Sequence, residues 1–238
     1  MMQSINPATG ELLNEFETWD SETVSDLVTQ AGYMFPDWSK ITTMEERCGL
    51  MRRVADVLRD DADLLAELIT LEMGKTITEA KAEIEKSAWV CDFYADKGPE
   101  FLADEPVETD ATKSYVSYMP LGVVLAVMPW NYPFWQVFRF AAPALIAGNV
   151  GLLKHASNVP QCALAIQEVF RKSGVPEHVF TTLMIGSSQV EEVIRHPAVK
   201  AVTLTGSEPA GRKVASIAGS ELKKTVLELG GSDAFIIN

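Results

Sequence analysis

The chain has 238 residues, of which 47% are hydrophobic and 22% are charged, and its formal net charge is -13. This balance is typical of a folded globular protein with a sizeable core and argues against a disordered chain. The negative charge excludes binding to nucleic acid or to an anionic membrane through a general electrostatic field, so an anion would need a local device such as a helix N-terminus.

Cysteine usage and the N-terminal sequence predict a cytoplasmic protein. Cys48, Cys91 and Cys162 form no Cys-x-x-Cys pair, and a sparse, odd number of cysteines indicates reduced thiols. Residues 1–7 have neither the basic flank nor the apolar region of a signal peptide. The most apolar stretch, residues 121–128, is too short to cross a bilayer.

Helical signals dominate the chain up to about residue 111. An acidic start and a closing proline predict a helix over residues 20–36, and Thr43 followed by glutamates caps a second, long helix that reaches about residue 74. A third helix is predicted over residues 78–96. Its charged residues Glu79, Glu83, Lys81 and Glu85 are expected on the surface, and Ala80, Ile84, Ala88 and Trp89 are expected to face inward.

Residues 112–119 form a separate element in the sequence. Alternation of polar with aromatic or β-branched residues over 113–118 predicts an exposed strand. Such a strand would present an unpaired edge, which is a liability for self-association.

From residue 120 to residue 238 the pattern alternates between strands and helices. Short apolar runs predict strands at residues 123–128, 150–153, 179–185, 201–205, 225–229 and 234–237. Helices are predicted between them, at residues 134–145, 160–173, 188–195 and 210–217. Continuously apolar strands separated by helices indicate an α/β fold with a Rossmann-like parallel sheet covered on both faces, preceded by the helical segment. Ligands of such sheets bind at the carboxyl ends of the strands.

The first candidate site is Met128-Pro129-Trp130-Asn131-Tyr132-Pro133, at the exit of the first parallel strand. The Asn131 side chain is an uncharged N–H donor that could be aimed at a developing oxyanion. The alternative is an asparagine that only satisfies a turn.

The second candidate is Lys154-His155-Ala156-Ser157, at the end of the second strand. A lysine here could donate hydrogen bonds to ribose hydroxyls or to a phosphate, or it could be an ordinary surface lysine. His155 is interpreted as a neighbour of the ligand rather than as a catalyst.

The third candidate is the stretch from Thr203 to Lys213, in which a strand ends at Gly206-Ser207 and a helix begins. The free N–H groups of that helix could face a pyrophosphate. The stretch fails as a phosphate-cradling Gly-x-x-x-x-Gly-Lys-Ser/Thr loop, because Arg212 and Lys213 occupy the last two positions. Gly-x-Gly-x-x-Gly is also absent from the sequence, and no metal site is expected.

The fourth candidate is Glu228, inside the apolar strand Thr225–Leu229 that runs into Gly230-Gly231. Apolar surroundings disfavour a carboxylate and would raise the pKa of Glu228 toward the range of a general base. The alternative is a strand-end acid that points to water.

Together these four segments resemble, in order and spacing, the N-terminal cofactor-binding portion of the aldehyde dehydrogenase superfamily. The resemblance extends from Asn6-Pro7-Ala8-Thr9-Gly10 through Glu72-Met73-Gly74-Lys75 to Leu227-Glu228-Leu229-Gly230-Gly231, and Pro-Trp-Asn-Tyr-Pro with Leu-Glu-Leu-Gly-Gly is a specific combination. It implies NAD(P)-dependent oxidation of an aldehyde to a carboxylate by way of a cysteine thiolate, a hydride transfer and a glutamate-activated water. It also implies a homo-oligomer in the full-length form, with residues 112–119 as the strand of the oligomerisation arm.

The resemblance assigns roles to particular residues. Asn131 is the oxyanion donor and Glu228 is the general base. The residues assigned to the dinucleotide are Met128, Pro129, Trp130, Asn131, Lys154, His155, Ala156, Ser157, Gly186, Gly206, Ser207 and Leu229. Ser157 stands where NAD-preferring relatives often carry a glutamate that would repel a 2′-phosphate, so NADP is expected to be accepted alongside or in preference to NAD.

Arg139 is the candidate for selecting the substrate. Asn131, Trp135 and Arg139 recur every four residues, so an early helix start would place them along one face, with Tyr132 close by. The cation could hold the far carboxylate of a short semialdehyde acid, as the corresponding arginine does in succinate-semialdehyde dehydrogenases, which this chain resembles most. The alternative is an arginine that pairs with a structural acid.

The nucleophile implied by the resemblance lies beyond Glu228, and none of the three cysteines matches its position. The chain is therefore expected to be a truncated dehydrogenase, inactive alone, with the catalytic domain absent. A stand-alone nucleotide-binding module and one chain of a split enzyme are the alternatives. Cys162 follows Pro160 in the first turn of a helix, where the dipole could lower its pKa, but a packed helical cysteine is the favoured interpretation.

Overall fold

The computed structural model describes residues 1–237, which are built around a five-stranded parallel sheet with the strand order β7-β6-β5-β8-β9. The strands are β5 (Val123–Met128), β6 (Val150–His155), β7 (Phe180–Thr182), β8 (Val199–Gly206) and β9 (Lys224–Leu229). Five of the predicted strands are thus present, and the α/β fold with a Rossmann-like sheet is confirmed. Residues 234–237, also predicted as a strand, form neither strand nor helix, because no neighbouring strand pairs with them in the described part of the chain.

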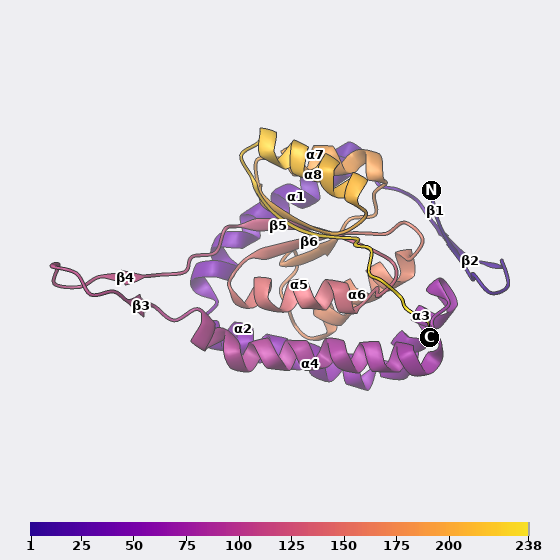
Figure 1. The fold of residues 1–238 in the computed structure, drawn as a ribbon, viewed down its shortest axis with the longest axis horizontal. Helices are drawn as coiled ribbons and strands as arrows, with labels where there is room; N and C mark the ends of the chain where they lie inside the picture. Colours follow the sequence, from indigo (N-terminus) through magenta and orange to yellow (C-terminus); the bar gives the residue numbers. More distant parts are fainter. Residues whose placement is uncertain (238) are drawn as a thin grey trace.

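Helices cover the sheet in layers, as Figure 1 shows. They are α1 (Ser21–Pro36), α2 (Met44–Asp60), α3 (Ala62–Met73), α4 (Ile77–Phe101), α5 (Trp135–Ile146), α6 (Pro160–Lys172), α7 (Val190–Arg195) and α8 (Glu208–Ser220), with a π-helical turn at Asp37–Ile41 and a 3-10 turn at Ser187–Gln189. Helices α1, α7 and α8 lie on one face of the sheet, and α5 and α6 lie on the other. The long helix α4, with α2, forms an outer layer over α5 and α6.

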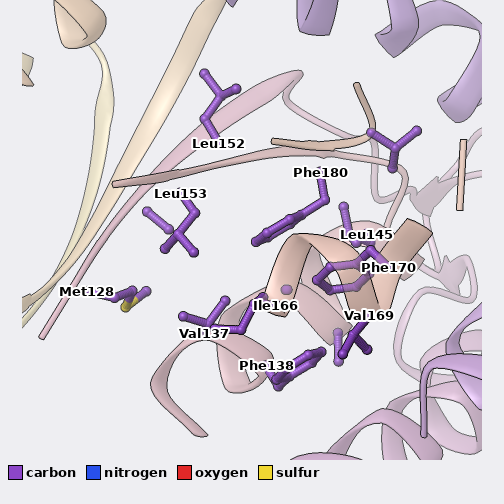
Figure 2. Close-up of a cluster of buried hydrophobic side chains, with 14 of the residues drawn as sticks. Met128, Val137, Phe138, Leu145, Leu152, Leu153, Ile166, Val169, Phe170 and Phe180 are labelled. Atoms are coloured by element: carbon purple, nitrogen blue, oxygen red, sulfur yellow. The ribbon is translucent and has the colours of Figure 1, made fainter. Parts of the chain in front are cut away.

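The main core lies between the sheet and the α5–α6 layer, where Figure 2 shows closely packed side chains. Leu153 of β6 points into this cluster, toward Val137 of α5 and Ile166 of α6. Neighbouring strand residues point to opposite faces, so Leu152 points away from this cluster and is equally buried, on a strand that α1 also contacts. Burial of both faces of β6 explains why its sequence is continuously apolar rather than alternating.

The outer strand β9 does not fit the prediction of a sheet covered on both faces. Helix α8 packs closely on one face, because Gly211 leaves no Cβ to collide with the side chain of Leu229. The opposite face borders an open hollow, and Val226 is 62% exposed.

The order of strands creates a switch point between β5 and β8. The chain moves from β5 outward to β6 and β7, then returns to the other side of β5 to form β8 and β9. The connections that leave β5 and β8 therefore diverge at the carboxyl edge of the sheet, and a crevice opens there.

The predicted long helix over residues 43–74 is two helices, α2 and α3, that break at Asp61. Asp60 and Asp61 are poor helix formers. The carboxylate of Asp61 forms an ion pair with Lys172 of α6 at 2.7 Å, which links the break to the next layer. The predicted caps at Asp20 and Thr43 are present, and Thr43 forms a full capping box with Glu46.

The third helix, α4, extends five residues beyond the predicted residue 96, to Phe101, although it contains Pro99. Proline cannot donate to the carbonyl of Ala95, and the guanidinium of Arg52 donates to that oxygen instead at 3.3 Å. Two predicted orientations on this helix are wrong. Trp89 is 54% exposed and stacks on Phe93, whereas Glu83 is 3% exposed.

Two hairpins project from the body at opposite ends (Figure 1). One joins β1 (Met2–Ile5) to β2 (Leu12–Phe16) and was not predicted. The other joins β3 (Glu105–Pro106) to β4 (Tyr115–Val116). Strand β4 lies within the strand predicted over residues 113–118, and β3 was not predicted. Among the described helices, none is both long and apolar enough to cross a lipid bilayer.

Candidate functional site

The predicted site segments all follow strands of the parallel sheet and meet at its carboxyl edge. Val127 and Met128 of β5 are in register with Lys154 and His155 of β6. Thr205 and Gly206 of β8 are in register with Glu228 and Leu229 of β9. Four segments far apart in the sequence are therefore side by side along one edge.

A hollow of about 480 Å³ lies at the switch point between β5 and β8. The residues that line it include Trp130, Asn131, Gly206, Glu228 and Leu229. The predicted oxyanion donor and the predicted general base thus face the same space, together with residues assigned to the dinucleotide.

Asn131 lies in the bend between β5 and α5, outside the helix, so it does not share a helical face with Trp135 and Arg139 as predicted. Its backbone carbonyl accepts a hydrogen bond from Lys75 at 3.1 Å. Its side-chain amide has no hydrogen-bond partner within residues 1–237, so it can donate to a ligand.

Lys154 is the next-to-last residue of β6 and is 7% exposed. Burial lowers the pKa of its ammonium group. No ion pair or hydrogen bond to this amine is found among the described residues, although a buried cation normally requires a partner. Its setting suits an anionic or hydroxyl-rich ligand at the edge of the sheet.

His155 has a structural role. One ring nitrogen, Nδ1, accepts from the backbone N–H of Ala156 at 2.8 Å, so the other, Nε2, carries the proton and donates to the carbonyl of Pro133 at 2.9 Å. Burial lowers the pKa of His155 to about 4, and the ring is neutral at pH 7. The ring ties the Pro129–Pro133 bend to β6. Both ring nitrogens are already hydrogen-bonded to the backbone, so neither is free to bond to a dinucleotide. Ala156 is partly buried and Ser157 is exposed beside it.

Two of the helices that follow strands have N-termini already occupied by carboxylates. Glu83 of α4 accepts from the backbone N–H groups of Phe134 and Trp135, at 2.8 and 3.0 Å, at the start of α5. Glu72 of α3 accepts from Gln161 and Cys162, at 2.8 and 2.7 Å, at the start of α6. A phosphate cannot use either helix end, because an acid of the protein itself already holds the free N–H groups.

The N-terminus of α8 is open by comparison. Ser207 occupies the N-cap position, and its side chain makes no capping hydrogen bond. Pro209 lies in the first turn, where its missing N–H removes no helical bond. Of the predicted phosphate-binding positions, Gly206 and Ser207 are therefore placed where a helix N-terminus remains available.

Arg139 and Glu228, predicted to bind the substrate carboxylate and to act as a base, form an ion pair with each other. The guanidinium also donates to Oε1 of Gln136 at 2.6 Å. Their side chains are 34% and 48% exposed, so the prediction that Glu228 lies in an apolar, desolvated setting is wrong. Glu228 lines both the switch-point hollow and a second hollow of about 540 Å³ over β8 and β9, and Arg139 and Met128 line the second hollow only.

Three other predicted residues lie away from Glu228. The ring of Tyr132 lies 3.6 Å from Nζ of Lys75, on the α4 side of the bend. The ring of Trp135 faces Lys86 of α4 at 4.0 Å. Gly186 leads into the 3-10 turn after β7, and its N–H donates to the side chain of Gln189 at 3.2 Å. Neither aromatic ring lines the switch-point hollow.

All three cysteines are buried thiols. Burial raises the pKa of each of them, and most strongly those of Cys91 and Cys162. The dipole of α6 does not activate Cys162, because the carboxylate of Glu72 lies at that helix end. None of the three is suited to be a nucleophile. For Cys162 this agrees with the prediction of a packed helical cysteine.

Sequence reasoning missed Glu72, Glu83 and Lys75. A signal was available, since each glutamate falls on the apolar face of its helix, in step with Leu65 and Ile69 or with Ala80 and Ile84. A carboxylate within such a face must find a partner. Which helix end it meets depends on the tertiary structure.

Comparison with known proteins agrees with this geometry. The model of the aldehyde dehydrogenase family matches residues 1–238. Among curated relatives, a probable succinate-semialdehyde dehydrogenase [NADP(+)] of Synechocystis sp. is 55% identical over 234 residues, and succinate-semialdehyde dehydrogenase [NADP(+)] 1 of Mycobacterium ulcerans is 53% identical over 235 residues. Each match covers 98% of this chain and 51% of the relative, so the chain spans about half the length of these relatives.

Solved structures give the same result for the fold. The succinic semialdehyde dehydrogenase of Streptococcus pyogenes, determined in complex with NADP+, superposes with a TM-score of 0.96 at 42% identity, over 99% of this chain and 52% of the other. The succinate-semialdehyde dehydrogenase of Burkholderia pseudomallei superposes with a TM-score of 0.93 at 30% identity, over 99% of this chain and 49% of the other.

Proposed function

The chain belongs to the aldehyde dehydrogenase family, and from that premise we propose that its switch-point crevice binds NADP for the oxidation of a short semialdehyde acid, succinate semialdehyde. The observation that carries the proposal is the crevice itself, which brings Asn131, Glu228 and the open start of α8 together at one edge of the sheet. The NADP(+) named for the relatives and for the Streptococcus pyogenes complex supports the choice of cofactor.

The residues present suit a dinucleotide. The pyrophosphate would lie at the N-terminus of α8 near Gly206 and Ser207, where no carboxylate accepts from the helix N–H groups, since the one acid of the first turn, Glu208, accepts from Arg212 instead. Lys154, buried and without a partner among the described residues, would donate to the ribose or its 2′-phosphate. Ser157 is exposed next to it and adds no negative charge, which favours a 2′-phosphate.

The bound nicotinamide would supply hydride acceptance, and the side chains would supply the remaining groups. Asn131 would donate its amide to the substrate oxygen as negative charge develops there. Glu228 would take a proton from the water that releases the acyl group. Arg139 would hold the far carboxylate of the substrate once it exchanges Glu228 for that ligand.

Attack on the aldehyde needs a nucleophile that residues 1–237 do not offer, since all three cysteines are buried thiols with raised pKa values. We therefore propose that this chain alone binds the dinucleotide without oxidising the aldehyde. The same observation favours the second candidate function, a nucleotide-binding module. Formation of NADPH from succinate semialdehyde by the purified chain would contradict both the inactivity of the chain alone and the nucleotide-binding module.

Calorimetric titration with NADP and with NAD tests the cofactor assignment, with Ser157→Glu as the matched variant. The wild-type chain should bind NADP at least as tightly as NAD, and S157E should weaken NADP by roughly tenfold or more because its carboxylate repels the 2′-phosphate. A preference of the wild-type chain for NAD by roughly tenfold or more would refute the NADP assignment. Binding of neither dinucleotide would refute the function.

A further inference from the structure

The most deeply buried ion pair of the described residues lies directly behind the Asn131 bend. It joins Lys75, just after α3, to Glu83 of α4, and their side chains are 8% and 1% exposed. Burying two opposite charges requires good geometry and further hydrogen bonds to offset the loss of hydration.

The further hydrogen bonds all lead to residues 131–135. One oxygen of Glu83 accepts from the N–H groups of Phe134 and Trp135. On the other side, Nζ of Lys75 donates to the backbone carbonyl of Asn131 at 3.1 Å and lies 3.6 Å from the ring centre of Tyr132. The ion pair therefore holds this segment by hydrogen bonds at both ends, at Asn131 and at Phe134 and Trp135.

The equivalent cap of α6 shows that helix capping alone does not need the lysine. Glu72 is 2% exposed and accepts from two N–H groups in the same way, but no cation pairs with it among the described residues. Burial accordingly raises the pKa of Glu72. The cation appears only at the cap of α5, where it also reaches the carbonyl of Asn131.

We propose that Lys75 and Glu83 are positioning residues that aim the Asn131 side chain into the switch-point hollow. They hold the backbone carbonyl of Asn131 and the first turn of α5, and so set the direction in which the Asn131 side chain leaves the backbone. A donor that stabilises developing charge is effective only when it is held in place before the reaction. This inference rests on the proposed function, which makes Asn131 the donor to the substrate oxygen.

The test uses the full 238-residue chain labelled with [15N]asparagine, in which Asn131→Asp identifies the Asn131 side-chain signal. Lys75→Met removes the charge but keeps the length, and it should shift and broaden this signal. Lys75→Arg keeps the cation and should restore it. Glu83→Gln should speed hydrogen exchange of the Phe134 and Trp135 amides by roughly tenfold or more.

Glu72→Gln is the matched control, because it alters the equivalent buried cap of α6. It should leave the Asn131 signal unchanged and speed exchange only at Gln161 and Cys162. A general loss of rigidity would instead change the Asn131 signal in E72Q as much as in K75M. That result would overturn the proposal.

An Asn131 signal in folded K75M identical to that of the wild-type chain would also overturn it. Should K75M fail to fold, Glu83→Asp decides, because it keeps the charge but withdraws the carboxylate by one methylene. The Asn131 signal should shift in E83D, and an unchanged signal would refute the positioning role.

Titration of the wild-type chain with NADP separates this inference from the function on which it rests. An Asn131 signal that depends on Lys75 but does not respond to NADP would leave the positioning in place and count against the function. An Asn131 signal that responds to NADP but does not change in the Lys75 and Glu83 variants would support the function and overturn the positioning role.

Discussion

His155 shows how a residue at a ligand site can serve the fold. Its ring is 4% exposed, and both nitrogens bond to the backbone, so protonation would leave two donors facing one acceptor and one N–H. Burial, with a contribution from Lys154, lowers the pKa of His155 from 6.5 to about 4. A histidine in such a setting contributes stability only while it is neutral.

We expect this residue to make the chain sensitive to acid. Because the pKa is lower in the folded state, its contribution is fully present above pH 6.5 and is lost as the pH falls toward about 4. The loss amounts to about 3 kcal/mol at most. Urea unfolding at pH 7 and pH 5 should show a steeper loss for the wild-type chain than for His155→Gln, and parallel losses would contradict the assignment.

Arg139 and Glu228, two residues of the candidate site, neutralise each other's charge in an ion pair. Both side chains are partly exposed, and such ion pairs contribute about 1 kcal/mol or less. A carboxylate ligand could therefore compete with Glu228 for the guanidinium. Under the proposed function, binding of the substrate would then release Glu228 to act as the base.

We expect Glu228→Gln to free Arg139 for a dicarboxylate. In the presence of NADP, succinate should bind E228Q roughly 2- to 5-fold more tightly than the wild-type chain, as judged by calorimetry. Arg139→Gln should abolish the difference. Equal affinity of E228Q and the wild-type chain would mean that Arg139 does not receive the carboxylate.

At the scale of elements, the sequence predicted best where an element depends on its own residues. The strand at 123–128 was predicted at its observed bounds. Its residues form a short, continuous apolar run, as expected for a strand that is buried on both faces. The break at Asp61 was missed because Asp60 and Asp61 lower helix propensity only modestly, and the ion pair with Lys172, more than a hundred residues away, is not visible in the sequence. The strand predicted at 234–237 was wrong for a related reason, since a strand needs a partner strand.

For the candidate site as well, the sequence predicted the position but not the contacts between side chains. Its position at the carboxyl edge followed from the alternation of apolar strands with helices, which indicates a parallel sheet, and Asn131 and Glu228 line one hollow there. The partners of the side chains could not be predicted. Glu83 was predicted on the surface although its spacing from Ala80 and Ile84 matches the inner face, and only the packing of α4 on α5 shows that it meets two free N–H groups.

The cap of α6 by Glu72 gives an element-scale prediction. Glu72→Ala would leave the N–H groups of Gln161 and Cys162 buried without an acceptor, and each such group costs about 1–3 kcal/mol. We expect E72A to lower the free energy of unfolding by about 2–4 kcal/mol. Glu67→Ala, on the exposed side of the same helix, should change it by about 0.5 kcal/mol or less. Similar losses in both variants, measured by urea unfolding, would argue against the capping role.

At the scale of the whole molecule, the β3–β4 hairpin is the part least supported by the rest. Figure 1 shows it extending away from the body. Each strand pairs only with the other in the described part of the chain, and Tyr115, Val116 and Tyr118 are 45%, 47% and 46% exposed. Free strand edges with apolar side chains pair readily with other chains.

We propose that this hairpin drives self-association of the chain, and Val116→Lys tests it. A charge in the short strand β4 should oppose edge pairing, so V116K should sediment as a smaller species than the wild-type chain at concentrations of about 10–100 µM. Leu12→Lys is the matched control, because Leu12 is 48% exposed on β2 of the other projecting hairpin, whose strand β1 packs against α3 and α6. L12K should associate like the wild-type chain. Loss of association in both variants would indicate a general effect of charge, and a wild-type chain that stays monomeric throughout this range would rule out association through β3–β4.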